Sequence, residues 1–74
     1  METIKLRDDY IKLGQALKAA GLVENGVTDS GVEAKFAVQD GKVQVNGAVE
    51  YQRGKKLYDG DEVTFEGTTI KIIK

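Results

Sequence analysis

Apolar side chains recur at helical spacing in the first third of the chain. Four of them fall at i, i+3, i+7 and i+10, on one face of a helix: Tyr10, Leu13, Leu17 and Ala20. Asp8 or Asp9 can cap the start of this helix. Gly21 follows its last turn, where glycine provides the left-handed conformation that ends helices, and Leu22 can pack back beneath it. The pattern therefore predicts a helix from Asp8 or Asp9 to about Ala20.

A second, shorter helix is predicted after residue 30. Ser30 and Glu33 have the spacing of a capping box, in which each side chain satisfies a free backbone N–H at the helix start. The helix should end near Asp40, with Gly41 beyond it. Its apolar residues lie on two sides, Ala34, Ala37 and Val38 on one and Val32 and Phe36 on the other. We therefore expect the second side to be covered by the N-terminal strand or the first helix.

Alternation of apolar and polar residues predicts short strands in the rest of the chain. Thr3 to Arg7 alternates weakly, and four apolar pairs alternate with polar residues further on: Val43 and Val45, Val49 and Tyr51, Val63 and Phe65, Ile70 and Ile72. Asn46-Gly47 favours a type I′ hairpin turn, and Glu66-Gly67 can turn the chain again. Glu24 to Asp29 contains Asn25-Gly26 without periodicity and is expected to be a loop. The predicted order is strand, helix, helix and four strands.

Length and composition restrict the protein to one domain, residues 1–74, with a thin core that buries about 60% of the unfolded surface. No run approaches the roughly 20 apolar residues of a membrane span, and no signal peptide is recognisable, so we expect a cytoplasmic monomer.

Composition also argues against catalysis, because the sequence has no cysteine and no histidine. Ser30, the single serine, therefore lacks an ordinary activating base, and capping explains it better than pairing with Lys35 one helical turn away. Asp8-Asp9 suits a helix start, and Asp59 and Asp61 flank a turn glycine. Neither glycine-rich phosphate-binding motif is present. We expect a non-enzymatic protein without metal or cofactor.

Charge is sorted along the chain although the net charge is only −1. Residues 35–56 contain five basic residues and two acidic ones, and residues 57–70 contain four acids and no base. A hairpin returning from Tyr51 could bring Arg53, Lys55 and Lys56 beside Lys35 and Lys42. Such a patch would face phosphate, and Gly54 would allow close approach of the backbone. The aromatic residues near this segment are expected in the core rather than as stacking platforms: Phe36, Tyr51 and Tyr58.

Several motifs in this order resemble a known family. They are Leu13, Leu17 and Gly21-Leu22, then Ser30-x-x-Glu33-Ala34, then Asp40-Gly41-x-Val43-x-Val45-Asn46-Gly47, then Gly60-Asp61-x-Val63. Together they resemble the alpha-L RNA-binding motif, the S4-type domain named from a ribosomal small-subunit protein. This domain also occurs in pseudouridine synthases, bacterial tyrosyl-tRNA synthetases and a heat-shock protein of the ribosome. The resemblance covers about Lys12 to Phe65 and is strongest to short stand-alone bacterial members.

The expected fold is α+β, with two packed helices against a small, mostly antiparallel, twisted sheet and an added N-terminal strand. The resemblance implies a non-catalytic module that recognises structured RNA, ribosomal or transfer RNA, through a basic patch. Carried over by position, it implies eight RNA-binding residues: Lys12, Ser30, Lys35, Lys42, Asn46, Arg53, Lys55 and Lys56. The chain departs from the family at Gly31, where arginine is common, at Gly14, where an acid is usual, and in a longer 23–29 loop.

A second interpretation from a different class is a small protein-interaction adaptor that presents the acidic strip Asp59 to Glu66 to a basic partner. The two interpretations differ in where the cations lie. Gathering of Lys35, Lys42, Arg53, Lys55 and Lys56 on one face favours RNA, and scattering favours the adaptor.

Overall fold

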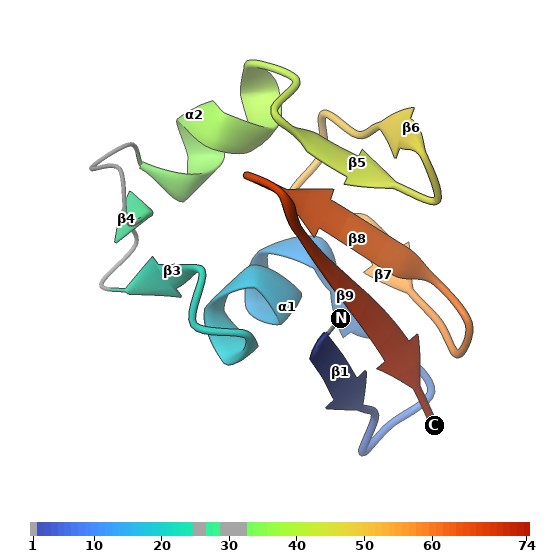
Figure 1. Ribbon diagram of the computed structural model, residues 1–74. Coiled ribbons are helices and arrows are strands. Elements are labelled where there is room, and N and C mark those ends of the chain that lie inside the picture. Colours follow the sequence, from blue (N-terminus) through green and yellow to red (C-terminus); the bar gives the residue numbers. More distant parts are fainter. Residues whose placement is uncertain (1, 25–26, 29–32) are drawn as a thin grey trace.

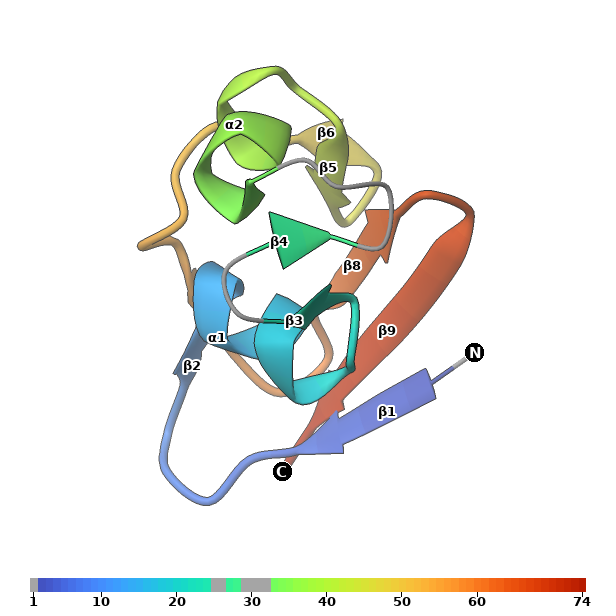
Figure 2. The same cartoon turned by 90° about the vertical axis from the view of Figure 1, so that its left-hand side faces the viewer.

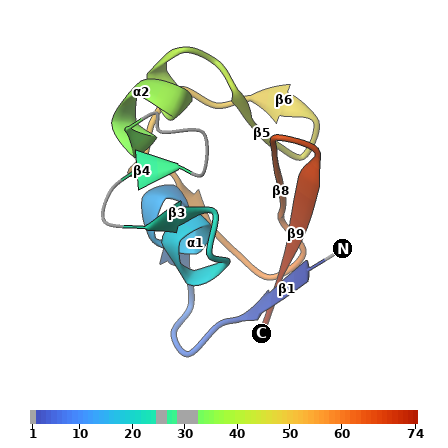
Figure 3. The ribbon, with the colours of Figure 1, turned by 60° about the vertical axis from the view of Figure 1, so that its left-hand side comes forward.

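The computed structural model describes residues 2–24, 27–28 and 33–74, which form two layers around one core. Figure 3 shows the sheet on one side, with both helices and a small hairpin on the other. The sheet has the order β1-β9-β8-β5-β6, and Figure 1 shows its strands. Their bounds are Glu2–Lys5 (β1), Val43–Val45 (β5), Ala48–Val49 (β6), Glu62–Phe65 (β8) and Thr68–Ile73 (β9).

The main sheet is antiparallel except at its N-terminal edge. β5 pairs antiparallel with β6 and β8, and β8 pairs antiparallel with β9, whereas β1 lies parallel to β9. The two-residue turns after β5 and β8 have positive φ at both central positions, 53° and 82° at Asn46-Gly47 and 50° and 79° at Glu66-Gly67. These are the signs of a type I′ turn. The mostly antiparallel sheet, its added N-terminal strand and both turns are thus confirmed.

The first helix, α1, spans Leu13–Ala19 and starts later than the sequence predicts. The residues before it form a short strand, β2 (Ile11–Lys12), which pairs antiparallel with β7 (Lys56–Leu57). Asp8 and Asp9 therefore do not cap α1; the N-cap is Lys12. Strand pairing with a segment far along the chain overrides the local capping signal.

The end of α1 agrees with the sequence. Gly21 has φ of 76°, and the Leu22 N–H donates to the Leu17 carbonyl at 3.0 Å. This closure of the last turn through a left-handed glycine is the expected helix C-terminus, and Leu22 packs partly buried against the core.

The second helix, α2, spans Ala34–Gln39, and Glu33 is its N-cap, with extended backbone and no side-chain capping bond. The predicted capping box requires Glu33 three positions inside the helix, so that assignment is wrong. Its other member, Ser30, lies outside the described residues. Phe36 is 47% exposed, which shows that the second apolar side of α2 is not covered as predicted.

Between the helices, the segment expected to be a loop contains a small hairpin. β3 (Val23–Glu24) pairs antiparallel with β4 (Val27–Thr28), with Glu24 opposite Val27. Two-residue strands carry too little alternation to be recognised, although the Asn-Gly dipeptide between them is itself a hairpin signal.

Both helices and the sheet contribute to a single core. Nine side chains are almost completely buried, and they come from both layers: Leu13, Leu17, Val38, Val43, Leu57, Val63, Phe65, Ile70 and Ile72. The core thus joins α1, α2, β5, β7, β8 and β9. Through β7 it reaches the segment Arg53 to Lys56, which we call the basic loop.

Asn46 connects two turns that are distant in sequence. Its Nδ2 donates to Asp61 Oδ1 at 3.0 Å, and its Oδ1 accepts the Glu62 N–H at 2.9 Å. Asp61 Oδ2 in turn accepts the Tyr58 N–H at 2.7 Å. The Asn-Gly and Gly-Asp motifs are therefore in direct contact, which explains in structural terms why they occur together.

Replacing Asn46→Ala should lower the free energy of unfolding by about 1–2 kcal/mol, because it removes two hydrogen bonds and places alanine in a left-handed conformation. The melting temperature should fall by roughly 4–8 °C for each kcal/mol, as measured by circular dichroism. Asn46→Gly is the matched control, since glycine restores the backbone freedom but not the side-chain amide. Its melting temperature should lie between those of wild type and Asn46→Ala. An unchanged midpoint for Asn46→Ala would contradict the bridging role.

Candidate nucleic-acid interface

The basic loop before β7 is fixed to the start of α1 by backbone hydrogen bonds. The Leu13 N–H donates to the Lys55 carbonyl at 2.9 Å, and the Gly14 N–H donates to the Arg53 carbonyl at 3.0 Å. These amides have no partner within the helix, so the loop satisfies them. Next to them, Lys12 and Lys56 are directly opposite each other in the β2–β7 pair. Strand pairing and helix capping together place the loop against α1.

A cavity of about 430 Å³ opens between α1, the start of α2 and this loop, and we call it the α1–α2 cavity. Ala34 and Gly54 belong to its wall, and three cations line it: Lys12, Lys18 and Arg53. No carboxylate belongs to its wall in the part of the chain that the structure describes. Figure 2 shows the chain descending from beside α2 to α1 on the way from β6 to β7. The cavity is a local concentration of positive charge in a slightly acidic chain.

Gly14 contributes to the positive charge of the cavity because it replaces an acidic residue. It stands where the resembling family usually has an acid, and a side chain there would meet the carbonyl oxygen and Cβ of Arg53 at 3.7 and 3.8 Å. A carboxylate at this position would therefore lie close to Arg53 and offset its charge. Glycine adds no carboxylate there, and Arg53 takes part in neither of the two ion pairs found in the part of the chain that the structure describes.

Two of the predicted site residues lie on or after α2. The Lys35 ammonium is 3.7 Å from a Glu33 carboxylate oxygen and 5.0 Å from the centre of the Phe36 ring. Lys42 is exposed just beyond the helix. The neighbouring Gly41 lies close to Tyr51, since a Cβ at Gly41 would be 3.3 Å from the Tyr51 ring. The chain after β6 thus passes the end of α2 before it reaches α1. The expected return from Tyr51 brings the chain beside Lys42, but the hydrogen bonds that fix the loop are to α1.

The five cations expected in one patch do not share a cavity, because only Arg53 of these five lines the α1–α2 cavity. The remaining predicted residues face a different side of the loop. Lys55 and Lys56 line a cavity of about 360 Å³ together with Glu50 and Asp61, so acids offset their charge there. The Lys56 ammonium lies 4.8 Å from the centre of the Tyr10 ring. Asn46 belongs to the same wall, but its amide is used within the protein, which gives it a positioning role. Ser30 lies outside the described residues.

Lys18 was missed by the sequence analysis. It lies on α1 three residues after Gln15 and four after Gly14, so it shares a helix face with them. This spacing is the signal that could have identified Lys18. Two ion pairs occur among the described residues, Lys35 with Glu33 and Lys74 with Asp9. Lys12, Lys18 and Arg53 take part in neither. The hydrogen bond from Lys74, and its charge, lower the pKa of the exposed Asp9 carboxyl.

The expectation that aromatic residues are buried is wrong for three of them. Phe36 is 47% exposed, Tyr51 60% and Tyr58 50%. A chain this short encloses too little volume to bury many rings, and its core is built mainly from branched aliphatic residues. Tyr10 is also exposed and lies 6.1 Å from Tyr58 between ring centres. Aromatic faces are therefore present at the surface beside the cations.

The described residues contain neither a cluster of metal ligands nor a membrane-spanning helix. No group of three or more potential metal ligands occurs among residues 2–24, 27–28 and 33–74. In the same residues, no helix has the length and apolar character needed to cross a membrane.

Comparison with known proteins assigns the fold and the family. The chain is 38% identical over 74 residues to YbcJ of Escherichia coli (strain K12), which is named as a candidate RNA-binding protein, and covers 99% of both chains. It is 39% identical over 64 residues to RlbA of Bacillus subtilis (strain 168), named a probable ribosome maturation protein, covering 86% of this chain and 83% of that protein.

The solution structure of YbcJ from Escherichia coli superposes with a TM-score of 0.69 at 32% identity, covering 100% of this chain and 89% of that one. That structure is described as containing an alpha-L motif involved in RNA binding. The model of the S4 domain family matches residues 4–73. Since this match spans nearly the whole sequence, the chain belongs to the S4 domain family.

Proposed function

We propose that this protein is a non-catalytic RNA-binding module that recognises structured RNA, ribosomal or transfer RNA, through the basic surface around the α1–α2 cavity. The observation that carries the proposal is the gathering of Lys12, Lys18 and Arg53 around one cavity whose described wall has no carboxylate. The names of the relatives YbcJ and RlbA support the same class of ligand.

The chemistry of the surface suits the phosphate backbone of A-form RNA, which proteins recognise mainly by shape and by contacts to phosphate and ribose. Arginine and lysine side chains bind phosphates with charge-assisted hydrogen bonds, and the absence of a Cβ at Gly54 lets a backbone approach the loop. The backbone hydrogen bonds between α1 and the loop would hold Lys12, Lys18 and Arg53 in a fixed arrangement. Arg53, Lys12 and Lys18 form the centre of the proposed surface, and we propose further phosphate contacts outside the cavity for Lys35, Lys42, Lys55 and Lys56.

The proposal includes the oligomeric state of the protein and its cellular location. A single copy already presents the complete α1–α2 cavity, so we propose that a monomer binds RNA. Because the proposed ligand is ribosomal or transfer RNA, we extend the proposal to the cytoplasm. We also propose an RNA contact for Ser30, which is supported by the family resemblance alone.

RNA affinity should depend steeply on salt. If four or five phosphates are neutralised, the slope of log K against log salt should be about −3 to −3.5 for single strands and about −4 for a duplex. Affinity for a structured RNA should be measured by fluorescence anisotropy at several potassium chloride concentrations. A slope near zero would contradict phosphate contact as the main source of affinity.

A further inference from the structure

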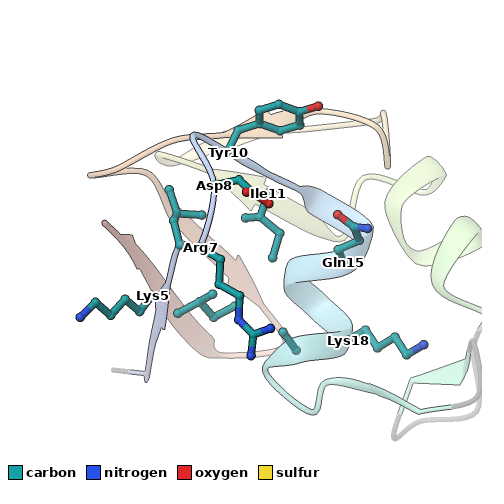
Figure 4. A pocket seen from close by; sticks show the side chains of 10 residues that line it. Lys5, Arg7, Asp8, Tyr10, Ile11, Gln15 and Lys18 are labelled. Carbon is teal, nitrogen blue, oxygen red and sulfur yellow. The ribbon is translucent and has the colours of Figure 1, made fainter.

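A second cavity lies on the other side of α1, where the N-terminal segment passes over the helix. We call it the N-terminal groove; it has a volume of about 740 Å³ and is lined from residues 4–11 and from α1. Leu6 is buried, and Ile4 and Ile11 are half-buried, which gives the groove an apolar floor. Figure 4 shows Arg7 reaching toward α1, while Tyr10 lies at the upper rim. This volume is in the range of pockets that bind small organic ligands.

The groove is also a cationic site. Arg7 and Lys18 line it, and Asp8 is the one carboxylate on its described wall. Lys5 lines its edge, but its ammonium points away from α1 in Figure 4. Neither Arg7 nor Lys18 takes part in the ion pairs found among the described residues. The groove therefore combines apolar surface with two cations that have no ion-pair partner among the described residues, the complement of a base and a phosphate.

Lys18 and Gln15 line both this groove and the α1–α2 cavity. The exposed edge of α1 thus separates two sites whose walls together contain five cations and one carboxylate in the described part of the chain: Lys5, Arg7, Lys12, Lys18 and Arg53 against Asp8. The whole sequence has 11 basic and 12 acidic residues, so this excess is a local separation of charge. A polyanion held in one cavity can continue over Lys18 into the other.

We propose that the N-terminal groove binds unpaired nucleotides that flank the structured RNA held at the α1–α2 cavity. Arg7 and Lys18 bind phosphates of the single strand, and a base lies on the apolar floor beside Tyr10. This inference rests on the proposed function and adds a second element to the ligand, a duplex with a single-stranded extension. Aromatic and apolar surface is what unpaired bases recognise, whereas paired bases are stacked within the helix.

Tyr10 links the groove to the basic loop. Its ring is 38% exposed, and Lys56 from β7 lies 4.8 Å from its centre, so a cation and an aromatic face are adjacent at the rim. Tyr58 lies tilted at 51° beside it. Two exposed rings with a neighbouring ammonium provide a surface on which a base can stack next to its phosphate.

The test compares a blunt RNA duplex with the same duplex carrying a short single-stranded extension at its 5′ or 3′ end. Wild-type protein should bind one of the extended duplexes at least about fivefold more tightly, since stacking of one base is worth about 1–3 kcal/mol. Arg7→Gln should remove most of this advantage and leave the affinity for the blunt duplex within about twofold, whereas Arg7→Lys should retain part of it. Lys71→Gln, which removes the same charge from the exposed side of β9, is the matched control and should keep the full advantage.

The outcomes separate the inference from the function on which it rests. Equal affinity for blunt and extended duplexes, or equal losses for Arg7→Gln and Lys71→Gln, would overturn the inference alone. The inference and the proposed function would both be supported by two results together. Arg53→Gln weakens binding to every duplex, and Arg7→Gln removes the advantage of the extended duplex. A wild-type protein that binds neither RNA would overturn both. Thermal melts of each variant establish that the fold is retained.

Discussion

Replacing Arg53 and Lys55 together by glutamine should weaken RNA binding by about a hundredfold or more. A hydrogen bond to a charged group contributes about 1.5–3 kcal/mol, so the loss of two phosphate contacts amounts to at least about 3 kcal/mol. The slope of log K against log salt should also become shallower by about 1.4–1.8. The fold should survive, because these residues contact α1 through their backbone carbonyls and both side chains are exposed.

Lys71→Gln with Lys74→Gln is the matched control, since it removes the same charge from exposed positions in and just after β9 that line neither cavity. This variant should bind RNA within about twofold of wild type, with a similar salt slope. Anisotropy titrations of both variants at the same salt series provide the comparison. Equal losses would show that RNA responds only to net charge, and the adaptor interpretation would then explain the chain better.

The acidic strip is largely used within the protein. Asp61 accepts hydrogen bonds from Asn46 and from the Tyr58 backbone, and Asp59 accepts the Lys74 backbone N–H at 3.0 Å. Carboxylates that hold turns and the chain end together have fewer free lone pairs for a basic partner. The position of these acids therefore favours RNA over the adaptor, and the sorting of charge along the sequence reflects their role in turns.

Local sequence patterns predicted the elements whose determinants are local. The turn at Asn46-Gly47 needs left-handed residues at two adjacent positions, and the alternation of Val43 and Val45 marks a half-buried strand. Gly21 ends α1 for a similarly local reason. The start of α1 could not be predicted this way, because Ile11–Lys12 pair with Lys56–Leu57, and a two-residue ladder has no periodicity of its own.

The same distinction applies to the candidate site. The cations of the basic loop were recognisable as a cluster in the sequence, and the family resemblance added Lys12. Their arrangement against α1 depends on the hydrogen bonds from Leu13 and Gly14, which join residues far apart in the chain. Lys18 and Arg7 gain significance only when α1 and the N-terminal segment lie side by side. Spatial convergence of isolated cations leaves no pattern along the sequence.

Leu57→Ala should reduce both stability and RNA binding. Leu57 is fully buried and lies directly after the basic loop, in the short strand that pairs with β2. Truncating such a leucine costs about 2–5 kcal/mol, a large part of the roughly 4–11 kcal/mol expected for a domain of this size. The melting temperature should fall by at least about 10 °C. Leu57→Met, which conserves volume, should cost less than about 1.5 kcal/mol.

Ile72→Ala separates the effect on the loop from the effect on stability. Ile72 is equally buried, but it lies in β9, outside the β2–β7 pair that anchors the basic loop, so its truncation should cost a similar free energy of unfolding. RNA affinity measured well below both melting temperatures should fall for Leu57→Ala and stay near wild type for Ile72→Ala. This difference follows because β7 holds the Lys55 and Arg53 carbonyls against α1, and a cavity beneath Leu57 frees the loop to move. Equal affinities for the two variants would mean that the loop binds RNA without needing this anchor.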